Sequence, residues 1–553
     1  MLTDPTSHTP ASHAPPGDMP IEEFRSFGYE VIDWIAEYLD QGPRAPVFCQ
    51  LEPGDVANRL PEKAPVSGEP FNDILGDFKE IIYPGFTHWN SPRYMAYFPS
   101  SASGPAILGE LLAAATNQNA MAWRTSPAGT ELELRVLEWF RDMLGLPADF
   151  HGHIVDTASI ATMLALTAAR EAHSELQIRT EGMAGRSDLK TLTVYTSEEA
   201  HSSVDKAVST LGIGLNHVRK IGADNNYCMI SNALHDAISA DLADGFHPLA
   251  VVATVGTTSS TSIDPIAEIA DVCREFNIWL HVDAAYAGVA ALVPEKRHIL
   301  NGCDRADSIV INPHKWLFTP VDCSTFYVRR PEVLKAAFSL IPEYLSSERD
   351  SEEAVTNLMD YGIQLGRRFR SLKLWMVLRY FGAEGLAERL RYHMKLADDL
   401  AEKIQNQPDV ELMAPVNFAT VCFRFRPEAL TGIAGWNGNG NGKGKGKGIE
   451  IEETESGSES ESESESESES ESESESESES ESESEKEEET ERKLEELNSR
   501  VMAEANASGL VFLSHTKLKG KYTLRLVFGH LRTTQEDVEM VWDLLTDLAS
   551  NAT

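Results

Sequence analysis

The sequence predicts an α/β protein whose large domain contains a mainly parallel sheet, followed by a smaller α+β domain. Three short runs, residues 249–254, 278–283 and 308–311, end about 28 to 29 residues apart, the length of a strand, a helix and two turns. The runs are nearly continuous in apolar residues, as strands covered on both faces are. Residues 192–195 form a fourth run of the same kind.

The chain has 553 residues, more than one hydrophobic core usually supports, so several structural units are expected. Residues 1–18 predict a disordered tail, and residues 19–100 a helical segment whose first amphipathic helix begins near Ile21. The large domain is expected at 101–370 and the small C-terminal domain at 371–553, with strands at 421–425 and 522–527.

One helix between the predicted strands can be read from its first residues. Asp264 is expected to cap it, and Pro265 to occupy its first turn. Ile266, Ile269 and Cys273 belong to its buried stripe.

Low-complexity sequence interrupts the small domain at 437–490. Residues 437–448 are a Gly/Asn/Lys tract, and residues 458–485 repeat Ser-Glu without an apolar residue. Such a segment cannot bury enough surface to offset the entropy of ordering, so it predicts a disordered surface insertion. A phosphorylation-dependent or cation-binding role for it is the alternative.

The charge of the chain excludes several classes of function. The net charge is -39, and residues 450–491 account for -21 of it, which leaves -18 for the rest. This balance argues against nucleic acid as a partner, because phosphate backbones are bound by clustered Lys and Arg. The six cysteines lie far apart without a CxxC pair, which fits neither a disulfide framework nor a metal site. Without a signal peptide or a long apolar run, a cytoplasmic protein with no membrane partner is expected.

Chemically unusual residues follow the predicted strands, at the sheet edge where open α/β folds bind ligands. Lys315 lies on a Pro-constrained turn after residues 308–311. A desolvated lysine can lose its proton and form a Schiff base, although a surface lysine would have the same sequence context. Asp283 ends another run and is expected to be buried, so it needs a cationic partner such as a protonated pyridine nitrogen. Ala285 beside it leaves room for a flat ring; capping of the next turn is the alternative for Asp283.

Two further strand ends complete the pattern. His201 follows residues 192–195 and is expected to open a helix, where its imidazole could stack on an aromatic cofactor or simply cap the helix. Thr157, Ala158 and Ser159 precede a helical run and offer backbone N–H groups at a helix N-terminus. Such a terminus is a potential phosphate site, although an ordinary capping motif looks the same.

With these residues in chain order, the sequence resembles the group II pyridoxal-phosphate-dependent decarboxylases, specifically the aromatic-L-amino-acid decarboxylases that act on tryptophan, tyrosine or DOPA. The resemblance runs from about residue 20 to residue 548, apart from the insertion. The segments that carry it are THWNSP at 87–92, AYFPS at 96–100, SPAGTELE at 126–133, HVDAAYAG at 281–288, NPHKW at 312–316 and LGRRFRSLK at 365–373.

The resemblance implies a fold-type I, aspartate aminotransferase-like enzyme with a sheet of the seven-stranded type, active as a homodimer with pyridoxal 5'-phosphate. Lys315 would carry the cofactor, Asp283 would pair with its ring nitrogen, and His201 would stack on its ring. The remaining cofactor contacts implied are the phosphate-binding Thr157, Ala158, Ser159, Asn312 and His314, with Thr258, Asp264 and Ala285 around the cofactor. The phosphate turn departs from the family's common glycine-serine form at Asp156-Thr157.

The resemblance also implies the reaction, decarboxylation of an aromatic L-amino acid to its amine. Tyr344, in a polar segment typical of a lid, would donate the final proton. Relatives that make aldehydes with oxygen tend to replace this tyrosine or the stacking histidine, so Tyr344 and His201 favour simple decarboxylation. The alternatives are an oxidative aldehyde synthase, a glutamate- or histidine-type decarboxylase, and a non-catalytic scaffold.

The substrate side chain is expected to lie among aromatic and apolar residues. The predicted lining is Trp89, Tyr97, Phe98, Met121 and Gly366. Indole-accepting relatives tend to carry glycine at the last position, so the resemblance favours L-tryptophan, converted to tryptamine. Hydroxytryptophan, tyrosine, DOPA and phenylalanine are the other candidates.

Overall fold

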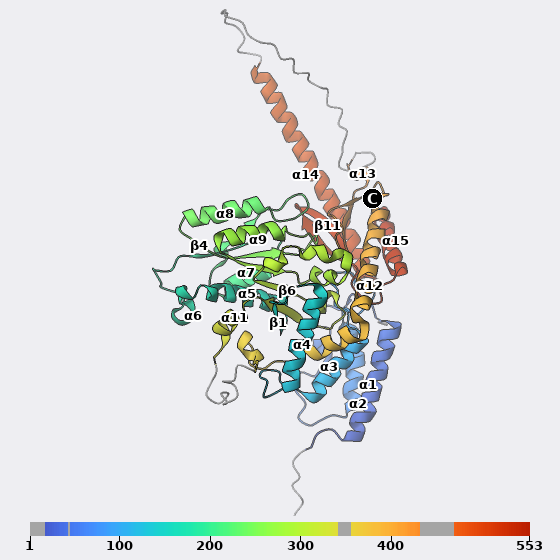
Figure 1. Ribbon diagram of the computed structural model, residues 1–553. Coiled ribbons are helices and arrows are strands. Elements are labelled where there is room, and N and C mark those ends of the chain that lie inside the picture. The colour runs from blue at the N-terminus through green and yellow to red at the C-terminus, as the bar shows by residue number, and fades with distance from the viewer. Residues whose placement is uncertain (1–16, 43–44, 341–354, 432–468, 553) are drawn as a thin grey trace, which may run out of the picture.

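The structure is a computed structural model that describes residues 17–42, 45–340, 355–431 and 469–552 (Figure 1). A seven-stranded sheet forms its centre, in the order β1-β7-β6-β5-β4-β2-β3. Only β7 runs antiparallel to its neighbours; the pairs β6–β5, β5–β4, β4–β2 and β2–β3 are parallel. The strands are β1 (His151–Val155), β2 (Leu192–Ser197), β3 (Val218–Ile221), β4 (His247–Thr254), β5 (Trp279–Asp283), β6 (Ser308–Ile311) and β7 (Ser324–Val328). The predicted mainly parallel sheet is therefore confirmed, and the four predicted runs form β2, β4, β5 and β6.

Side chains alternate between the two covered faces of this sheet. In β4, Val251 and Ala253 pack with α4 (Pro127–Leu144), α8 (Ser231–Ala243) and α9 (Ile266–Phe276). Ala250 and Val252 pack on the opposite face with α5 (Ala158–Ala172), α7 (Ser203–Thr210) and α11 (Pro331–Phe338). Because a strand has a period of two, burial on both faces requires the nearly continuous apolar runs seen in the sequence.

The predicted cap of α9 is wrong. The helix begins at Ile266 after Pro265, but no side chain caps it. The Asp264 carboxylate instead accepts the N–H groups of Met229 and Thr254, at 2.8 and 2.7 Å. An aspartate beside a helix start can satisfy any nearby backbone donor, and here the end of β4 provides one.

The C-terminal part of the chain contains a second sheet, which is antiparallel and ordered β10-β11-β9-β8. Its strands are β8 (Val410–Leu412), β9 (Thr420–Phe425), β10 (Ser514–Leu518) and β11 (Lys521–Val527). The long helices of this part are α12 (Ser371–Gln405), α14 (Glu469–Ala507) and α15 (Gln535–Ala552). Shorter helices elsewhere are α6 (Ile178–Glu181), α10 (Pro313–Trp316) and α13 (Glu428–Thr431).

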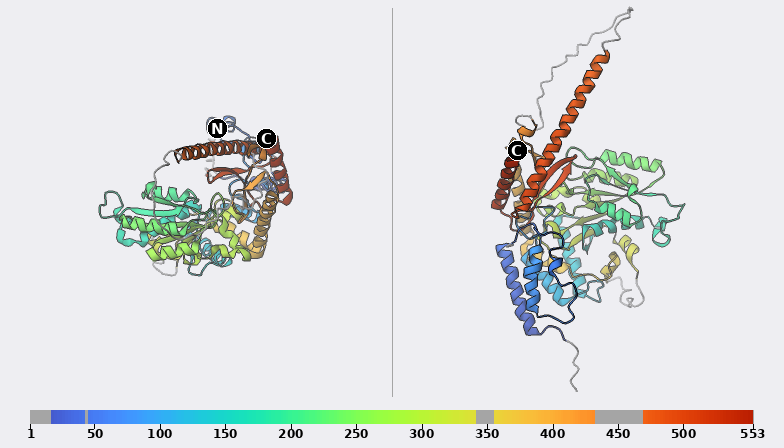
Figure 2. Two further views of the ribbon diagram at one scale, coloured as in Figure 1. Left: turned by 90° about the horizontal axis from the view of Figure 1, so that it is seen from above. Right: turned by 180° about the vertical axis from the view of Figure 1, so that it is seen from behind.

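Helix α14 begins inside the low-complexity insertion. Its backbone is helical from residue 469, whereas residues 437–468 lie outside the described ranges, so the disorder expected for the insertion stays a prediction. Leu494, Leu497 and Val501 are buried at the C-terminal end of α14 and anchor it. Glutamate favours helix, and extending an existing helix costs little compared with starting one. Figures 1 and 2 show α14 extending well beyond the two sheets.

The N-terminal helices are α1 (Ile21–Gln41), α2 (Phe71–Asp77) and α3 (Gly104–Thr116), and α1 with α2 extends from the body at the end opposite to α14 (Figure 2). Trp34 of α1 contacts the rings of Phe78 and Tyr83 at 5.2 and 5.5 Å. Ile21 and Phe24 remain 65% and 58% exposed, so the apolar side of α1 is only partly covered within one chain. Within the described residues, no helix is long and apolar enough to cross a membrane.

Buried histidines make stability depend on pH. His393 of α12 accepts the indole N–H of Trp316 at 3.0 Å, and burial lowers the pKa of His393 from its usual 6.5 to about 4. Between these two values the unfolded chain binds a proton that the folded chain does not, so stability falls as the pH falls through this window.

Replacing His393 tests this dependence. We expect His393→Gln to reduce the slope of unfolding free energy against pH by about 1.4 kcal/mol per pH unit inside the window. Urea titrations between about pH 7 and about pH 4.5 measure the slope. His235→Gln, at an exposed position of α8, is the control, and equal slopes for all three proteins would contradict the prediction.

Candidate active site

A pocket of about 400 Å³ lies beyond the ends of β2, β4 and β6, where the small sheet approaches the large one. Its walls come from segments far apart in the chain. The lining residues include Trp89, Tyr97, Phe98, Ser100, His201, Thr258, His314, Lys315, Ser514 and Arg525. Seven of the predicted site residues line this pocket: Trp89, Tyr97, Phe98, His201, Thr258, His314 and Lys315.

Lys315 lies on α10, the single turn of helix that follows β6. Its backbone N–H donates to the Asn312 carbonyl, and the buried ring of Trp316 fixes the next residue. The ammonium nitrogen lies 5.1 Å from the centre of the Phe98 ring. Burial lowers the pKa of Lys315; nearby Asp283 opposes this effect and Arg525 adds to it. A lysine with a lowered pKa has more of the neutral amine that reacts with an aldehyde.

Asp283 ends β5 and is 7% exposed. Its Oδ1 accepts the Ala285 N–H at 3.0 Å, which orients the carboxylate. Asp283 acts electrostatically on both Lys315 and His201, raising the pKa of each against the effect of burial. A buried carboxylate next to a reactive lysine is a strong electrostatic feature of a site.

His201 lies between β2 and α7 and is exposed in the pocket. Its Nδ1 accepts the Ser203 N–H at 3.1 Å, so the ring proton of the neutral form is on Nε2. Burial lowers the pKa of His201, Asp283 raises it and Lys315 lowers it again. The ring is thus held neutral and oriented by the start of the helix.

Thr157 is the N-cap residue of α5, and Ala158 and Ser159 form the first turn. His314 lies across from this turn: its Nδ1 accepts the Cys323 N–H at 2.9 Å, and burial lowers its pKa to about 4. The Asn312 amide is 1% exposed and lies 3.4 Å from His314 Nε2. In either orientation of this amide one polar atom lacks a partner among the described residues, so the site has unused capacity to bind a polar ligand.

Arg525 is a site residue that the sequence analysis missed. It lies on β11 and is 4% exposed, with its guanidinium 4.6 Å from the Phe98 ring. Nε donates to the Ser259 carbonyl at 3.0 Å and Nη1 to the Tyr97 carbonyl, while Nη2 is buried without a partner in the described part of the chain. A buried, incompletely paired guanidinium favours binding of an anion. An apolar β-strand that contains one arginine, LRLVF, was the available signal.

Tyr97 and Phe98 reach the pocket through an unusual backbone turn. Tyr97 has a φ of 50°, in the left-handed region that side chains with a Cβ rarely adopt. The Tyr97 N–H donates to the Ser514 hydroxyl, and the Tyr97 carbonyl accepts from Arg525. Contacts from the small sheet therefore hold the aromatic wall of the pocket in place.

Comparison with known proteins decides what this arrangement is. The family model described as the pyridoxal-dependent decarboxylase conserved domain matches residues 53–426. The chain belongs to this family. Pyridoxal phosphate is the cofactor of this decarboxylase, and its class is that of the carboxy-lyases.

Similarity to known relatives extends over nearly the whole chain of the decarboxylase. It is 36% identical to tryptophan decarboxylase 2 of Oryza sativa subsp. japonica over 540 residues, covering 96% of this chain and 95% of that protein. It is 35% identical to phenylacetaldehyde synthase of Arabidopsis thaliana over 540 residues, covering 96% and 97%. The crystal structure of Oryza sativa TDC with PLP and tryptamine matches with a TM-score of 0.84 at 32% identity, covering 97% of this chain and 99% of that one. The predicted fold-type I architecture is confirmed.

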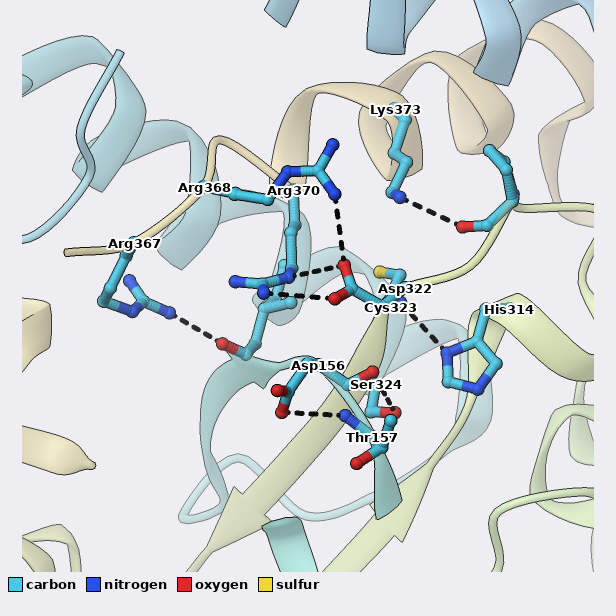
Figure 3. A network of polar contacts seen from close by, with 12 residues as sticks. Asp156, Thr157, His314, Asp322, Cys323, Ser324, Arg367, Arg368, Arg370 and Lys373 are labelled. Atoms are coloured by element: carbon cyan, nitrogen blue, oxygen red, sulfur yellow. Dashed lines mark hydrogen bonds and ion pairs between the residues drawn. The ribbon is translucent and has the colours of Figure 1, made fainter. Parts of the chain in front are cut away.

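The described residues of the decarboxylase fit its cofactor. Lys315 and His201 line one pocket, Asp283 is close enough to raise the pKa of both, and Asn312 offers a buried polar atom without a partner in the described residues. The turn at Thr157 lies in the same region, because the Ser324 hydroxyl donates to the Asp156 carbonyl and Cys323 contacts His314 (Figure 3). Asp264 accepts the N–H of Thr254, the residue paired with Asp283 in the sheet, and burial raises the pKa of Asp264 to about 6.

Nine predicted site residues that the structure describes do not line this pocket: Thr157, Ala158, Ser159, Asp264, Asp283, Ala285 and Asn312 of the cofactor set, and Met121 and Gly366 of the substrate set. Met121 and Gly366 lie together around Asn119: the Asn119 amide is 3.6 Å from Met121 Sδ, and a Cβ added to Gly366 would lie 3.9 Å from that amide. The Asn119 Oδ1 accepts the Arg367 N–H at 2.9 Å, which joins the two segments. Tyr344 lies in residues 341–354, outside the described ranges.

Proposed function

We propose that this decarboxylase converts an aromatic L-amino acid into its amine and CO₂, with L-tryptophan to tryptamine as the first candidate. The observation that carries the proposal is a pocket lined by the aromatic residues Trp89, Tyr97 and Phe98 together with Lys315, His201 and Arg525. Trp89 and Tyr97 are 44% and 54% exposed and nearly parallel, at 6.2 Å between ring centres, so they offer a surface for a flat ring. Tryptophan decarboxylases among the relatives support the choice of substrate.

Each end of the substrate has a chemically suitable partner in the pocket. The aromatic ring would lie against Trp89 and Tyr97, which bury apolar surface without charge. The α-carboxylate would face the unpaired Nη2 of Arg525 and the Nε2–H of His201. Binding in this manner holds the carboxylate near Lys315 and displaces water from the apolar wall.

When bound, pyridoxal phosphate accepts the electron pair that remains when CO₂ leaves the substrate. Asp283 would keep the proton on the ring nitrogen, because a carboxylate buried with one fixed oxygen stabilises a cation beside it. His201 would cover the ring face in its neutral form, and Asn312, His314 and the start of α5 would hold the phosphate. Tyr344 is the proposed donor of the proton that completes the amine.

We further propose that two copies of the chain form each working site. Met121 and Gly366 lie together but apart from the Lys315 pocket of their own chain, so their predicted contact with substrate requires a second chain. The apolar residues of α1 that remain exposed, with Leu108, Leu111 and Leu112 of α3, offer a surface for that contact. Exposed apolar area of this kind is typical of subunit interfaces.

The products of the reaction test the proposed function. The protein, purified with pyridoxal phosphate, is given L-tryptophan, tyrosine, DOPA and phenylalanine singly, and amine, aldehyde and hydrogen peroxide are measured. We expect amine without peroxide, and tryptamine formed with the highest kcat/KM. Aldehyde with stoichiometric peroxide would instead assign the activity of the phenylacetaldehyde synthases, and no turnover of any aromatic substrate would contradict the proposal.

A further inference from the structure

A carboxylate occupies the end of the site where the cofactor's phosphate is proposed to bind. Asp156 directly follows β1 and precedes Thr157, the N-cap residue of α5. A helix N-terminus binds phosphate through its unpaired N–H groups and its positive dipole end. An acidic side chain at this position is therefore unexpected for an enzyme that must hold a phosphate there.

Asp156 already uses one of the backbone donors of the turn. Its Oδ1 accepts the Thr157 N–H at 3.0 Å (Figure 3). Its Oδ2 accepts the Gln364 amide at 3.3 Å. The Asp156 carbonyl accepts the Ser324 hydroxyl at 3.2 Å, which fixes the backbone of the turn to β7. The carboxylate is thus held at the turn by the protein itself, with no ligand needed to satisfy it.

Asp156 also lies within electrostatic range of an incompletely paired cation. Arg370 is 6% exposed and contacts Asp322 through Nε at 2.9 Å and Nη2 at 3.3 Å. Its Nη1 is buried and has no partner within the described ranges. Burial lowers the pKa of the Arg370 guanidinium, whereas the negative charges of Asp322 and, to a smaller extent, Asp156 raise it. The net effect is a raised pKa. Asp156 therefore supplies part of the negative charge that this buried arginine needs.

We propose that Asp156 competes with the phosphate of pyridoxal phosphate for the Thr157 N–H, and that its negative charge at the start of α5 weakens cofactor binding. The inference rests on the proposed position of the phosphate at the start of α5. Two anions at one helix terminus repel, and the phosphate gains the Thr157 N–H only when the carboxylate releases it. The Asp156 carboxylate therefore provides a hydrogen-bond acceptor for the Thr157 N–H in the cofactor-free protein, and it lowers the affinity of the protein for pyridoxal phosphate.

Binding to the apoprotein tests this inference without any measurement of activity. Asp156→Asn removes the charge but keeps an oxygen for the Thr157 N–H, and Asp156→Gly removes both. Affinities for pyridoxal phosphate and for pyridoxal, which lacks the phosphate, are measured by equilibrium dialysis and by quenching of tryptophan fluorescence. We expect Asp156→Asn to bind pyridoxal phosphate about tenfold more tightly than the wild type, and Asp156→Gly at least as tightly, with pyridoxal affinity unchanged.

Asp149→Asn is the matched control, because Asp149 lies just before the other end of β1 and loses the same charge. Unchanged or weaker binding of pyridoxal phosphate by both Asp156 variants would overturn the inference, as would an equal change for pyridoxal. Failure of both variants to fold would show that Asp156 is structural, and would overturn it too. Absence of amino acid turnover would count against the proposed function alone, since the binding comparison does not depend on it.

Discussion

Lys315→Ala is expected to lower decarboxylation by about a thousandfold or more while leaving the fold intact. Lys315 is the amine at the base of the pocket, and its pKa is lowered by burial, so no other described lysine can replace it there. Its side chain is not part of the support of α10, which the buried Trp316 and its bond to His393 provide. The variant should therefore fold normally but retain the cofactor without a covalent bond.

Mass spectrometry after borohydride reduction measures this directly, because reduction fixes a lysine-bound cofactor to the protein. The wild type should gain the mass of the reduced cofactor on the peptide that contains Lys315, and the variant should not. Lys335→Ala, at an exposed position of α11, is the control and should behave as the wild type. Cofactor fixed to a different lysine in the wild type would refute the assignment.

Four strands of the large sheet could be predicted from the sequence, because they are short apolar runs, three of them at a regular spacing. Residues 308–311, for example, coincide with β6, because a run of four apolar or small residues between turns has the length of a strand and is too short for a buried helix. Lys315, Asp283 and His201 could be grouped for a related reason: parallel strands end at the same edge, so the residues that follow them meet.

Other residues of the site could not be found from the sequence, because contacts between distant segments decide them. Arg525 reaches the pocket through β11, more than 200 residues after Lys315 in the chain, and although the apolar run LRLVF around it indicates burial, the run does not indicate which segments Arg525 contacts. The helix cap predicted at Asp264 failed because β4 offered a donor at closer range. The structure of residues 469–490 depends on the buried end of α14, which a local reading of Ser-Glu repeats does not include.

Asp283→Asn is expected to lower kcat by about a hundredfold to a thousandfold at saturating cofactor and substrate. Asparagine has nearly the same shape, and its amide oxygen can still accept the Ala285 N–H that now binds Asp283 Oδ1. The substitution therefore removes a charge and little else. Without that charge the ring nitrogen of the cofactor would lose its proton, and the ring would accept less readily the electron pair that stays on the substrate when CO₂ leaves.

Two measurements separate this role from a structural one. The ¹⁵N chemical shift of ring-labelled cofactor should report a protonated nitrogen in the wild type and an unprotonated one in Asp283→Asn, and Asp283→Glu should recover part of both the shift and kcat. Asp241→Asn is the matched control, because Asp241 is also buried but pairs with Arg219 at the far end of α8, so it should alter stability and leave the shift unchanged. A kcat within about threefold of the wild type in Asp283→Asn would mean that Asp283 does not hold the proton on the ring nitrogen, since that small change amounts to only about 0.7 kcal/mol.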